Sequence, residues 1–237
     1  MISHRRYLLV LGVAFAVLWV VLGVHPHNRR DWTLENLLVF ALVPALVVTR
    51  KRLPFSRVSY TLIFIFLCLH EIGAHYTYAE VPYDAWFQAV TGRSLNGLLG
   101  WQRNQFDRLT HFMYGLLLAY PIREVFLRVA DVRGFWGYFL PLDFTMSTSL
   151  TFELVEWAVA SVVADDLAAM YLGTQGDVWD PHKDTALASC GALIAMTVTA
   201  LINWRLRRDF AREWAASLRV KHPRPLGEET IRRRRRR

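Results

Sequence analysis

Long apolar runs constrain this chain more than any other feature. Residues 7–24 contain no charged side chain, and a helix of about 17–25 apolar residues is long enough to cross the hydrocarbon layer of a membrane. The sequence therefore predicts an all-α polytopic membrane protein, a bundle of about six transmembrane helices. The five further runs, several of them interrupted by a charged group, are residues 32–49, 58–79, 109–127, 138–164 and 185–204.

The first two runs each have an alternative interpretation. A basic N-terminus before an apolar stretch is also typical of a signal peptide, but this stretch is too long and no small-residue cleavage site follows it. The second run is short between Leu37 and Val48 and contains Pro44, so it spans a membrane only if Trp32 and Glu35 are included. We interpret both runs as membrane helices.

The basic residues predict the side of the membrane on which each connection lies, because Lys and Arg near span ends are retained in the cytoplasm. Five connections join the six apolar runs. The second and fourth of these connections, together with the two termini, hold 22 of the 28 Lys and Arg residues, whereas the first, third and fifth connections hold six. Both termini are therefore predicted to be cytoplasmic, which requires an even number of spans. Residues 80–108 and 165–184 are then external.

The net charge of +8 comes from the C-terminal tail, since residues 205–237 carry +9 and residues 1–204 carry −1. We expect a six-helix transmembrane domain over residues 1–204 and a basic cytoplasmic tail over residues 205–237, first amphipathic and then disordered. Its mixture of aromatic and basic residues is typical of a segment that lies on anionic lipid. It fits a retention signal equally well. No nucleic acid is expected as a partner.

A polar seam interrupts the fifth run. Glu153 and Glu156 lie on one helix face together with Thr145 and Ser149. An ionised side chain inside a membrane is costly unless it is paired or faces a cavity. We therefore expect this face to point into the bundle.

The third run ends in a string that resembles the metalloprotease motif H-E-x-x-H with one residue too many. His70 and His75 lie about 140° apart around a helix, so they cannot bind one zinc ion from a shared face. Glu71, His75 and Tyr78 do share a face of the predicted helix. This part of the chain supplies polar candidates, but it is no zinc-protease motif.

More acidic and histidine residues begin the fourth and sixth runs. Asp107 and His111 are four residues apart, and Asp180 before Pro181 predicts a helix start with Asp180 as the N-cap. The predicted topology brings ten carboxylates and imidazoles to the external side, where they can converge from four helices: His70, Glu71, His75, Asp107, His111, Glu153, Glu156, Asp177, Asp180 and Asp184.

These groups have a structural and a chemical interpretation. Asp180 fits a helix cap better than a ligand, and Asp107 can simply hold His111 on a surface. Carboxylate and imidazole groups also suit a divalent metal ion. We assign catalytic roles to Glu153, Glu156 and His111. The candidate metal ligands are His75, Asp107, Asp177 and Asp184, and further candidates are His70, Glu71, Tyr78 and Asp180.

Four ordered motifs, at residues 70–78, 103–111, 153–157 and 173–184, resemble the YjdF-like family of uncharacterised bacterial inner-membrane proteins. The resemblance implies a multi-pass protein of the bacterial inner membrane and brings no established reaction. The same acidic pattern is more distantly similar to the VanZ-like pattern associated with glycopeptide resistance. The chain departs from that pattern at Asp184, where Asn is expected, and in its His-rich third run.

Three classes of function fit these observations. A metal-dependent hydrolase or transferase would act on a lipid-linked or phosphate-bearing substrate at the outer face. A non-enzymatic envelope or lipid-binding protein of the VanZ-like resistance type would use the polar groups as a structural network, packed against the small residues Ala188, Gly191, Ala192 and Ala195. A small transporter is less favoured, because the sequence contains no internal repeat. Metal identity, substrate and oligomeric state stay open.

Overall fold

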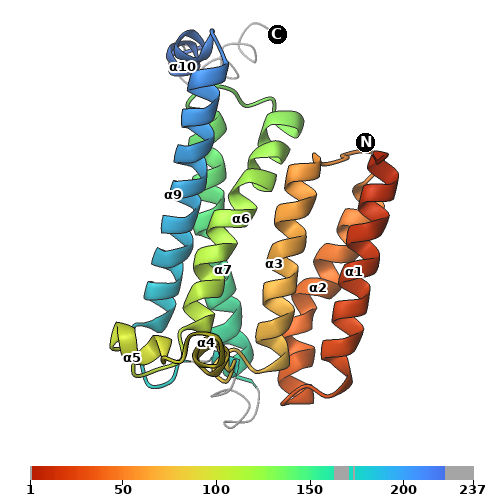
Figure 1. Ribbon diagram of the computed structural model, residues 1–237. Coiled ribbons are helices and arrows are strands. Elements are labelled where there is room, and N and C mark those ends of the chain that lie inside the picture. Colours follow the sequence, from red (N-terminus) through yellow and green to blue (C-terminus); the bar gives the residue numbers. More distant parts are fainter. Residues whose placement is uncertain (1, 163–170, 173, 222–237) are drawn as a thin grey trace, which may run out of the picture.

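The computed structural model describes residues 2–162, 171–172 and 174–221, and these residues fold into helices without strands. The described residues form six long helices. Figure 1 shows these helices side by side in alternating directions, with the start of α1 and the short α10 (Phe210–Ser217) at one end. The end of the tail that we expect to be disordered lies outside the described residues. The long helices are α1 (His4–Val24), α2 (Arg29–Thr49), α3 (Arg57–His75), α6 (Phe106–Val129), α7 (Trp136–Ala160) and α9 (Asp180–Leu206).

The first three helices begin at polar caps. The side chains of Ser3, Asn28 and Ser56 accept hydrogen bonds from backbone amides of the first turns of α1, α2 and α3, which otherwise have no partner within the helix. Helix α2 continues through Pro44 over 21 residues. The second run, the weakest in the sequence, is thus confirmed as a helix that is long and apolar enough to cross a membrane.

The outer surface of the bundle is apolar. Within the described residues, α1, α2, α3 and α9 are long and apolar enough to span a membrane. On α1, the side chains of Val10, Val13 and Val17 are more than half exposed. Exposed apolar side chains of this kind are favourable in contact with lipid and unfavourable in contact with water. Helices α6 and α7 have 24 and 25 residues but carry more polar and charged groups. The chain is a polytopic membrane protein.

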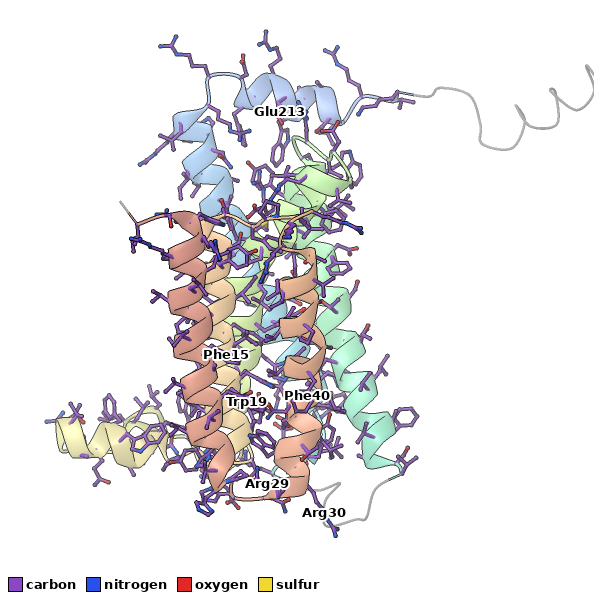
Figure 2. The ribbon with its side chains drawn as sticks, turned by 90° about the vertical axis from the view of Figure 1, so that its right-hand side faces the viewer. Phe15, Trp19, Arg29, Arg30, Phe40 and Glu213 are labelled. Atoms are coloured by element: carbon purple, nitrogen blue, oxygen red, sulfur yellow. The ribbon has the colours of Figure 1, made fainter. Side chains whose placement is uncertain are left out.

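Two short helices, α4 (Tyr83–Thr91) and α5 (Leu95–Leu99), form the connection between α3 and α6. Helix α4 ends at Thr91 and is followed by Gly92, whose φ of 76° is left-handed. The Asp84 carboxylate accepts hydrogen bonds from the Asn96 amide and the Ser94 hydroxyl, and these bonds lower the pKa of Asp84. Figure 2 shows this segment projecting sideways from the bundle.

Helix α3 ends at His75, four residues earlier than the sequence predicts. Tyr78 has a left-handed φ of 48° and its amide donates to the Gly73 carbonyl, so the chain turns back. The Tyr78 hydroxyl then lies 2.5 Å from Nδ1 of His70. The prediction that Tyr78 shares a helix face with Glu71 and His75 is therefore wrong, because Tyr78 lies beyond the helix.

Helices α6 and α9 pack closely through small residues. Gly115 and Gly191 lie where each helix contacts the backbone of the other, and Ala188 and Ala192 are fully buried between them. Small residues allow such an approach in membranes, where packing rather than the hydrophobic effect joins helices. The expected close packing of the last membrane helix is confirmed.

Helix α10 folds back onto the start of α7. The Trp214 ring contacts the rings of Phe135 and Tyr138, and the Ser217 hydroxyl accepts a hydrogen bond from the Phe135 amide. The tail therefore begins as a helix, as predicted, but its aromatic side packs on the protein. Arg212 on the same helix is exposed.

Candidate functional site

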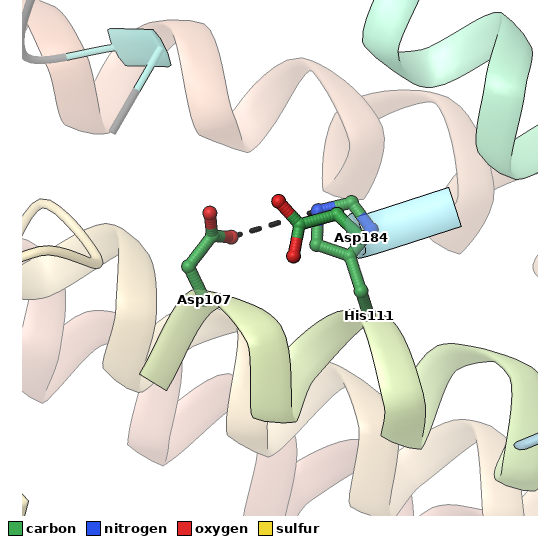
Figure 3. Close-up of side chains that lie close together, drawn as sticks. All are labelled: Asp107, His111 and Asp184. Atoms are coloured by element: carbon green, nitrogen blue, oxygen red, sulfur yellow. Dashed lines mark ion pairs between the residues drawn. The ribbon is translucent and has the colours of Figure 1, made fainter. Parts of the chain in front are cut away.

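Three side chains of the metal-ligating type converge between α6 and α9. Asp107, His111 and Asp184 each offer one ligand atom, and these atoms lie within 4.8 Å of one another. Figure 3 shows the three groups facing a common point. Asp107 and His111 lie one turn apart on α6, with His111 Nε2 3.6 Å from Asp107 Oδ1. Asp184 comes from the first turns of α9 and is almost fully buried.

Glu153 brings α7 to the same place. Its Oε1 lies 3.4 Å from His111 Nε2. Among the residues that the structure describes, neither Glu153 Oε1 nor Asp184 Oδ1 has a hydrogen-bond partner. A buried carboxylate oxygen in this state is costly, and a bound cation would remove the cost. Thr145 and Ser149 are also buried, so the predicted polar seam does face the interior.

The basic residues form a separate layer with Asp177 and Asp180. Arg103 binds Asp180 through two contacts, Nη1 to Oδ1 at 2.6 Å and Nη2 to Oδ2 at 3.0 Å. Arg108 Nη2 lies 2.5 Å from Asp177 Oδ2 and 3.0 Å from Asp180 Oδ1. Lys183 Nζ also lies 2.5 Å from Asp177 Oδ2. These pairs neutralise Asp177 and Asp180 rather than the carboxylates around His111.

The carboxylates of Asp177 and Asp180 therefore act as ion-pair partners of basic side chains. The bond from Lys183, followed by the Trp179 amide and with a contribution from Arg108, lowers the pKa of Asp177 to about 2. Helix α9 begins at Asp180 with Trp179 in the N-cap position and no side-chain cap bond. The prediction that Asp180 is the N-cap is wrong by one residue, because its carboxylate binds two arginines instead.

A cavity of about 300 Å³ is lined by two of the three candidate ligands, Asp107 and His111, and lies among α2, α3, α6 and α7. Asp107, His111 and Glu156 line it together with the apolar Phe66 and Phe152. The cavity thus combines charged groups with apolar walls. A ligand that has both a polar and an apolar part matches such a lining.

The cavity also receives residues of α2 that sequence reasoning missed. Glu35 lines it, is buried, and offers its backbone carbonyl to Nε2 of His70 at 3.2 Å. Asn36 is fully buried and accepts a hydrogen bond from Trp19 Nε1. The sequence does indicate these residues, since Glu35 and Asn36 are polar side chains within the second apolar run. The sequence predicts Glu35 only as an end residue of the second span, because the run reaches the necessary length when Trp32 and Glu35 are included.

The candidates from α3 are not part of the group of three ligands, but His70 lines the same cavity as Asp107 and His111. His70 is enclosed between Glu35 and Tyr78, and Glu71 is fully buried. His75 Nδ1 lies 2.7 Å from the Leu22 carbonyl oxygen of α1, and its ring packs against His27. The structure therefore brings together Asp107, His111, Asp184 and Glu153, and the adjoining cavity is lined by Glu156, His70 and Tyr78. It does not bring His75 or Asp177 into that group.

Comparison with known proteins agrees with this architecture. Residues 7–205 match the family model described as predicted membrane protein (DUF2238). The chain is 34% identical over 209 residues to the inner membrane protein YjdF of Escherichia coli strain K12. The aligned region covers 85% of this chain and 94% of that protein. No solved structure matches the chain.

Proposed function

The chain belongs to the DUF2238 family of predicted membrane proteins, and we propose that this multi-pass protein of the bacterial inner membrane binds a divalent metal ion. Asp107, His111 and Asp184 are the proposed ligands. The observation that carries the proposal is that the ligand atoms of these three side chains lie within 4.8 Å of one another. In addition, Oδ1 of Asp184 and Oε1 of the neighbouring Glu153 are buried without a hydrogen-bond partner in the described part of the chain.

The donor set favours a small first-row cation. One imidazole with carboxylates suits Zn²⁺ or Mn²⁺, whereas Ca²⁺ prefers six to eight oxygen ligands. With bonds of about 2.0–2.2 Å to nitrogen and oxygen, a cation between the three side chains requires only small movements of their ends. Three protein ligands leave a coordination position for water or for an oxygen atom of a ligand.

The proposed ligand is phosphate-bearing or lipid-linked. A metal beside the cavity would bind a phosphate oxygen, and the apolar Phe66 and Phe152 would contact a hydrocarbon part. If the protein is an enzyme, the metal can activate water or a hydroxyl for hydrolysis or transfer. Glu153 and Glu156 then supply the acid and base groups, while His111 holds the metal.

The proposal includes an orientation. Helices α6 and α7 complete six spans, both termini are cytoplasmic, and the candidate metal centre lies at the outer face. The common end of the α1 start and α10 in Figure 1 supports an even number of spans, and the distribution of basic residues supports the assignment of sides. The basic tail then lies beside anionic lipid of the cytoplasmic leaflet.

Metal content and calorimetric titration of the purified protein test the proposal. The wild type should bind one Mn²⁺ or Zn²⁺ ion per chain, and Asp184→Asn and His111→Gln should each lose it. Asp31→Asn is the matched control, because Asp31 is a carboxylate with 1% exposure outside the group of three. Wild-type protein without metal binding would reject the proposal.

The Arg103–Asp180 pair favours a second candidate, a non-enzymatic protein whose polar cluster is structural. This pair joins the connection before α6 to the start of α9 with two hydrogen bonds. In that case Asp184→Asn would change the melting temperature, while adding metal or a chelator would change nothing. The two candidates therefore differ in their response to metal and not in their response to mutation.

A further inference from the structure

Three carboxylates from three helices line the cavity beside the candidate metal centre. They belong to Glu35 of α2, Asp107 of α6 and Glu156 of α7. Within the described residues no Lys or Arg lines this cavity, and residues 163–170 contain neither type. A phosphate-bearing ligand would therefore meet three acidic side chains and, apart from the proposed metal, no permanent positive charge.

The two histidines of the cavity are already engaged. His70 Nε2 lies 3.2 Å from the carbonyl oxygen of Glu35, and His70 Nδ1 lies 2.5 Å from the hydroxyl oxygen of Tyr78. His111 Nε2 lies close to the carboxylates of Asp107 and Glu153, and as a metal ligand its imidazole is neutral. Neither ring is therefore placed to balance the charge of Glu35.

Glu35 is a buried carboxylate surrounded by like charges. Its side chain lines the cavity, and the residue is only 5% exposed. The charged groups that act on it are Asp31, Asp107 and Glu71, which are all acidic. Its backbone carbonyl accepts a hydrogen bond from His70, but among the described residues no hydrogen bond reaches its carboxylate. Such a group is costly to bury, and a ligand ammonium group would supply both the charge and the hydrogen bond.

The remaining walls of the cavity are rich in aromatic rings. The rings of Phe66 and Tyr114 contact each other edge to face at 5.7 Å, and the Tyr114 hydroxyl lies 2.6 Å from Thr148 Oγ1, so this part of the wall is held in place. Ammonium groups are attracted to the faces of aromatic rings, most strongly where water is excluded. The aromatic residues that line the cavity are Phe66, Tyr78, Tyr114, Phe152 and Tyr171.

From this combination we propose that the ligand of the cavity is an aminoalkyl phosphate, which carries an ammonium group beside its phosphate. The ammonium group donates hydrogen bonds to the carboxylate of Glu35 and contacts the aromatic wall. The inference rests on the proposed function for the phosphate, which binds the metal, and adds the positive group. An amino phospholipid headgroup and a free aminoalkyl phosphate share this chemistry.

Calorimetric titration of the protein loaded with Mn²⁺ or Zn²⁺ tests the proposal. The probes are O-phosphoethanolamine and sn-glycerol 3-phosphate, two phosphate monoesters of which only the first has an ammonium group. The wild type should bind phosphoethanolamine about tenfold more tightly, as expected for hydrogen bonds to a charged group. Glu35→Gln should abolish this preference. It should still bind the metal, which shows that it is folded, because Glu35 is not one of the three ligands.

Two further variants keep the test specific. Phe66→Leu keeps the wall apolar but removes a ring, so it should weaken phosphoethanolamine binding about fivefold and leave glycerol 3-phosphate binding unchanged. Asp31→Asn is the matched control, because Asp31 is a buried carboxylate one turn before Glu35 that does not line the cavity. It should keep the wild-type preference.

Native mass spectrometry of the metal-loaded protein in a neutral detergent distinguishes the two sources of the ligand. Retention of phosphatidylethanolamine over phosphatidylglycerol, without binding of free phosphoethanolamine, would assign the lipid, whereas binding of the free compound alone would assign the soluble ligand. A wild type that binds metal but prefers neither amino compound would overturn this inference and leave the metal centre intact. Absence of metal binding would reject the proposed function and this inference with it.

Discussion

A β-carbon on Gly115 of α6 would lie 1.8 Å from the carbonyl oxygen of Ala188 in α9, so the two backbones touch at this point. The contact is reciprocal, because a β-carbon on Gly191 would lie 2.2 Å from the carbonyl oxygen of Phe112. His111 lies one turn before Gly115, and Asp184 lies one turn before Ala188. The crossing therefore determines how close these two candidate ligands lie.

Gly115→Leu should separate α6 from α9 and weaken metal binding together with stability. A side chain forced into a closely packed site costs about 1–3 kcal/mol, which a thermal melt in detergent would detect. Gly12→Leu is the control, since the described structure has nothing within 4 Å of a β-carbon at Gly12. Wild-type metal affinity in Gly115→Leu would show that the crossing does not position the ligands.

Asp180→Asn should destabilise the protein strongly, because Arg103 and Arg108 then lose their ion pairs with the buried Asp180 carboxylate. The side chains of Arg103 and Asp180 are 14% and 2% exposed, and breaking a buried pair costs about 3–5 kcal/mol. The double variant Arg103→Gln/Asp180→Asn should lose less free energy of unfolding than the sum of the losses of the two single variants. The matched pair Arg133–Asp131 has side chains that are 71% and 80% exposed. Its removal should cost less than about 1 kcal/mol, and equal costs at the two pairs would refute this account.

Asp177 gives a pH-dependent prediction. Its pKa is lowered from 3.8 to about 2, so its ion pairs stabilise the folded state above its ordinary pKa and are lost as the pH falls toward 2. The melting temperature of the wild type should exceed that of Asp177→Asn near neutral pH. The difference should shrink only below about pH 4. A difference that already disappears near neutral pH would mean that Lys183 and Arg108 do not hold the ionised carboxylate.

Alkaline phosphatase fusions test the proposed orientation, because the enzyme is active only outside the cytoplasm. Fusions after residue 57 and after residue 133 should be inactive, and a fusion after residue 172 should be active. Residue 57 is the first residue of α3, residue 133 lies between α6 and α7, and residue 172 lies after α7. Activity at either of the first two sites, or inactivity at the third, would move the candidate metal centre away from the outer face.

The membrane architecture could be predicted because apolar runs are a one-dimensional signal. Residues 7–24 identify α1 directly, and the apolar run over residues 32–49 identifies α2 despite Pro44. Helices α4 and α5 could not be found in this way, since nine and five residues are too few to show a run. The early end of α3 depends on the left-handed turn at Tyr78, which L-residues rarely adopt.

The candidate site could be predicted only as a set of residues. The spacing of Asp107 and His111 places both on one face of α6, but nothing local pairs Arg103 with Asp180, 77 residues later. That pairing removed Asp180 and Asp177 from the set of free carboxylates. His75 was assigned to the cluster through the topology alone, and its contact with Leu22 depends on how α1 packs against α3.

The position of a bound metal tests the central claim most directly. Crystals grown in lipid with Mn²⁺ or Zn²⁺ would give an anomalous difference map at the absorption edge of the metal. The account predicts one peak among the side chains of Asp107, His111 and Asp184, within about 2.0–2.3 Å of a ligand atom of each. A map without a peak at this position, or with its peak beside His27 and His75 instead, would contradict the account.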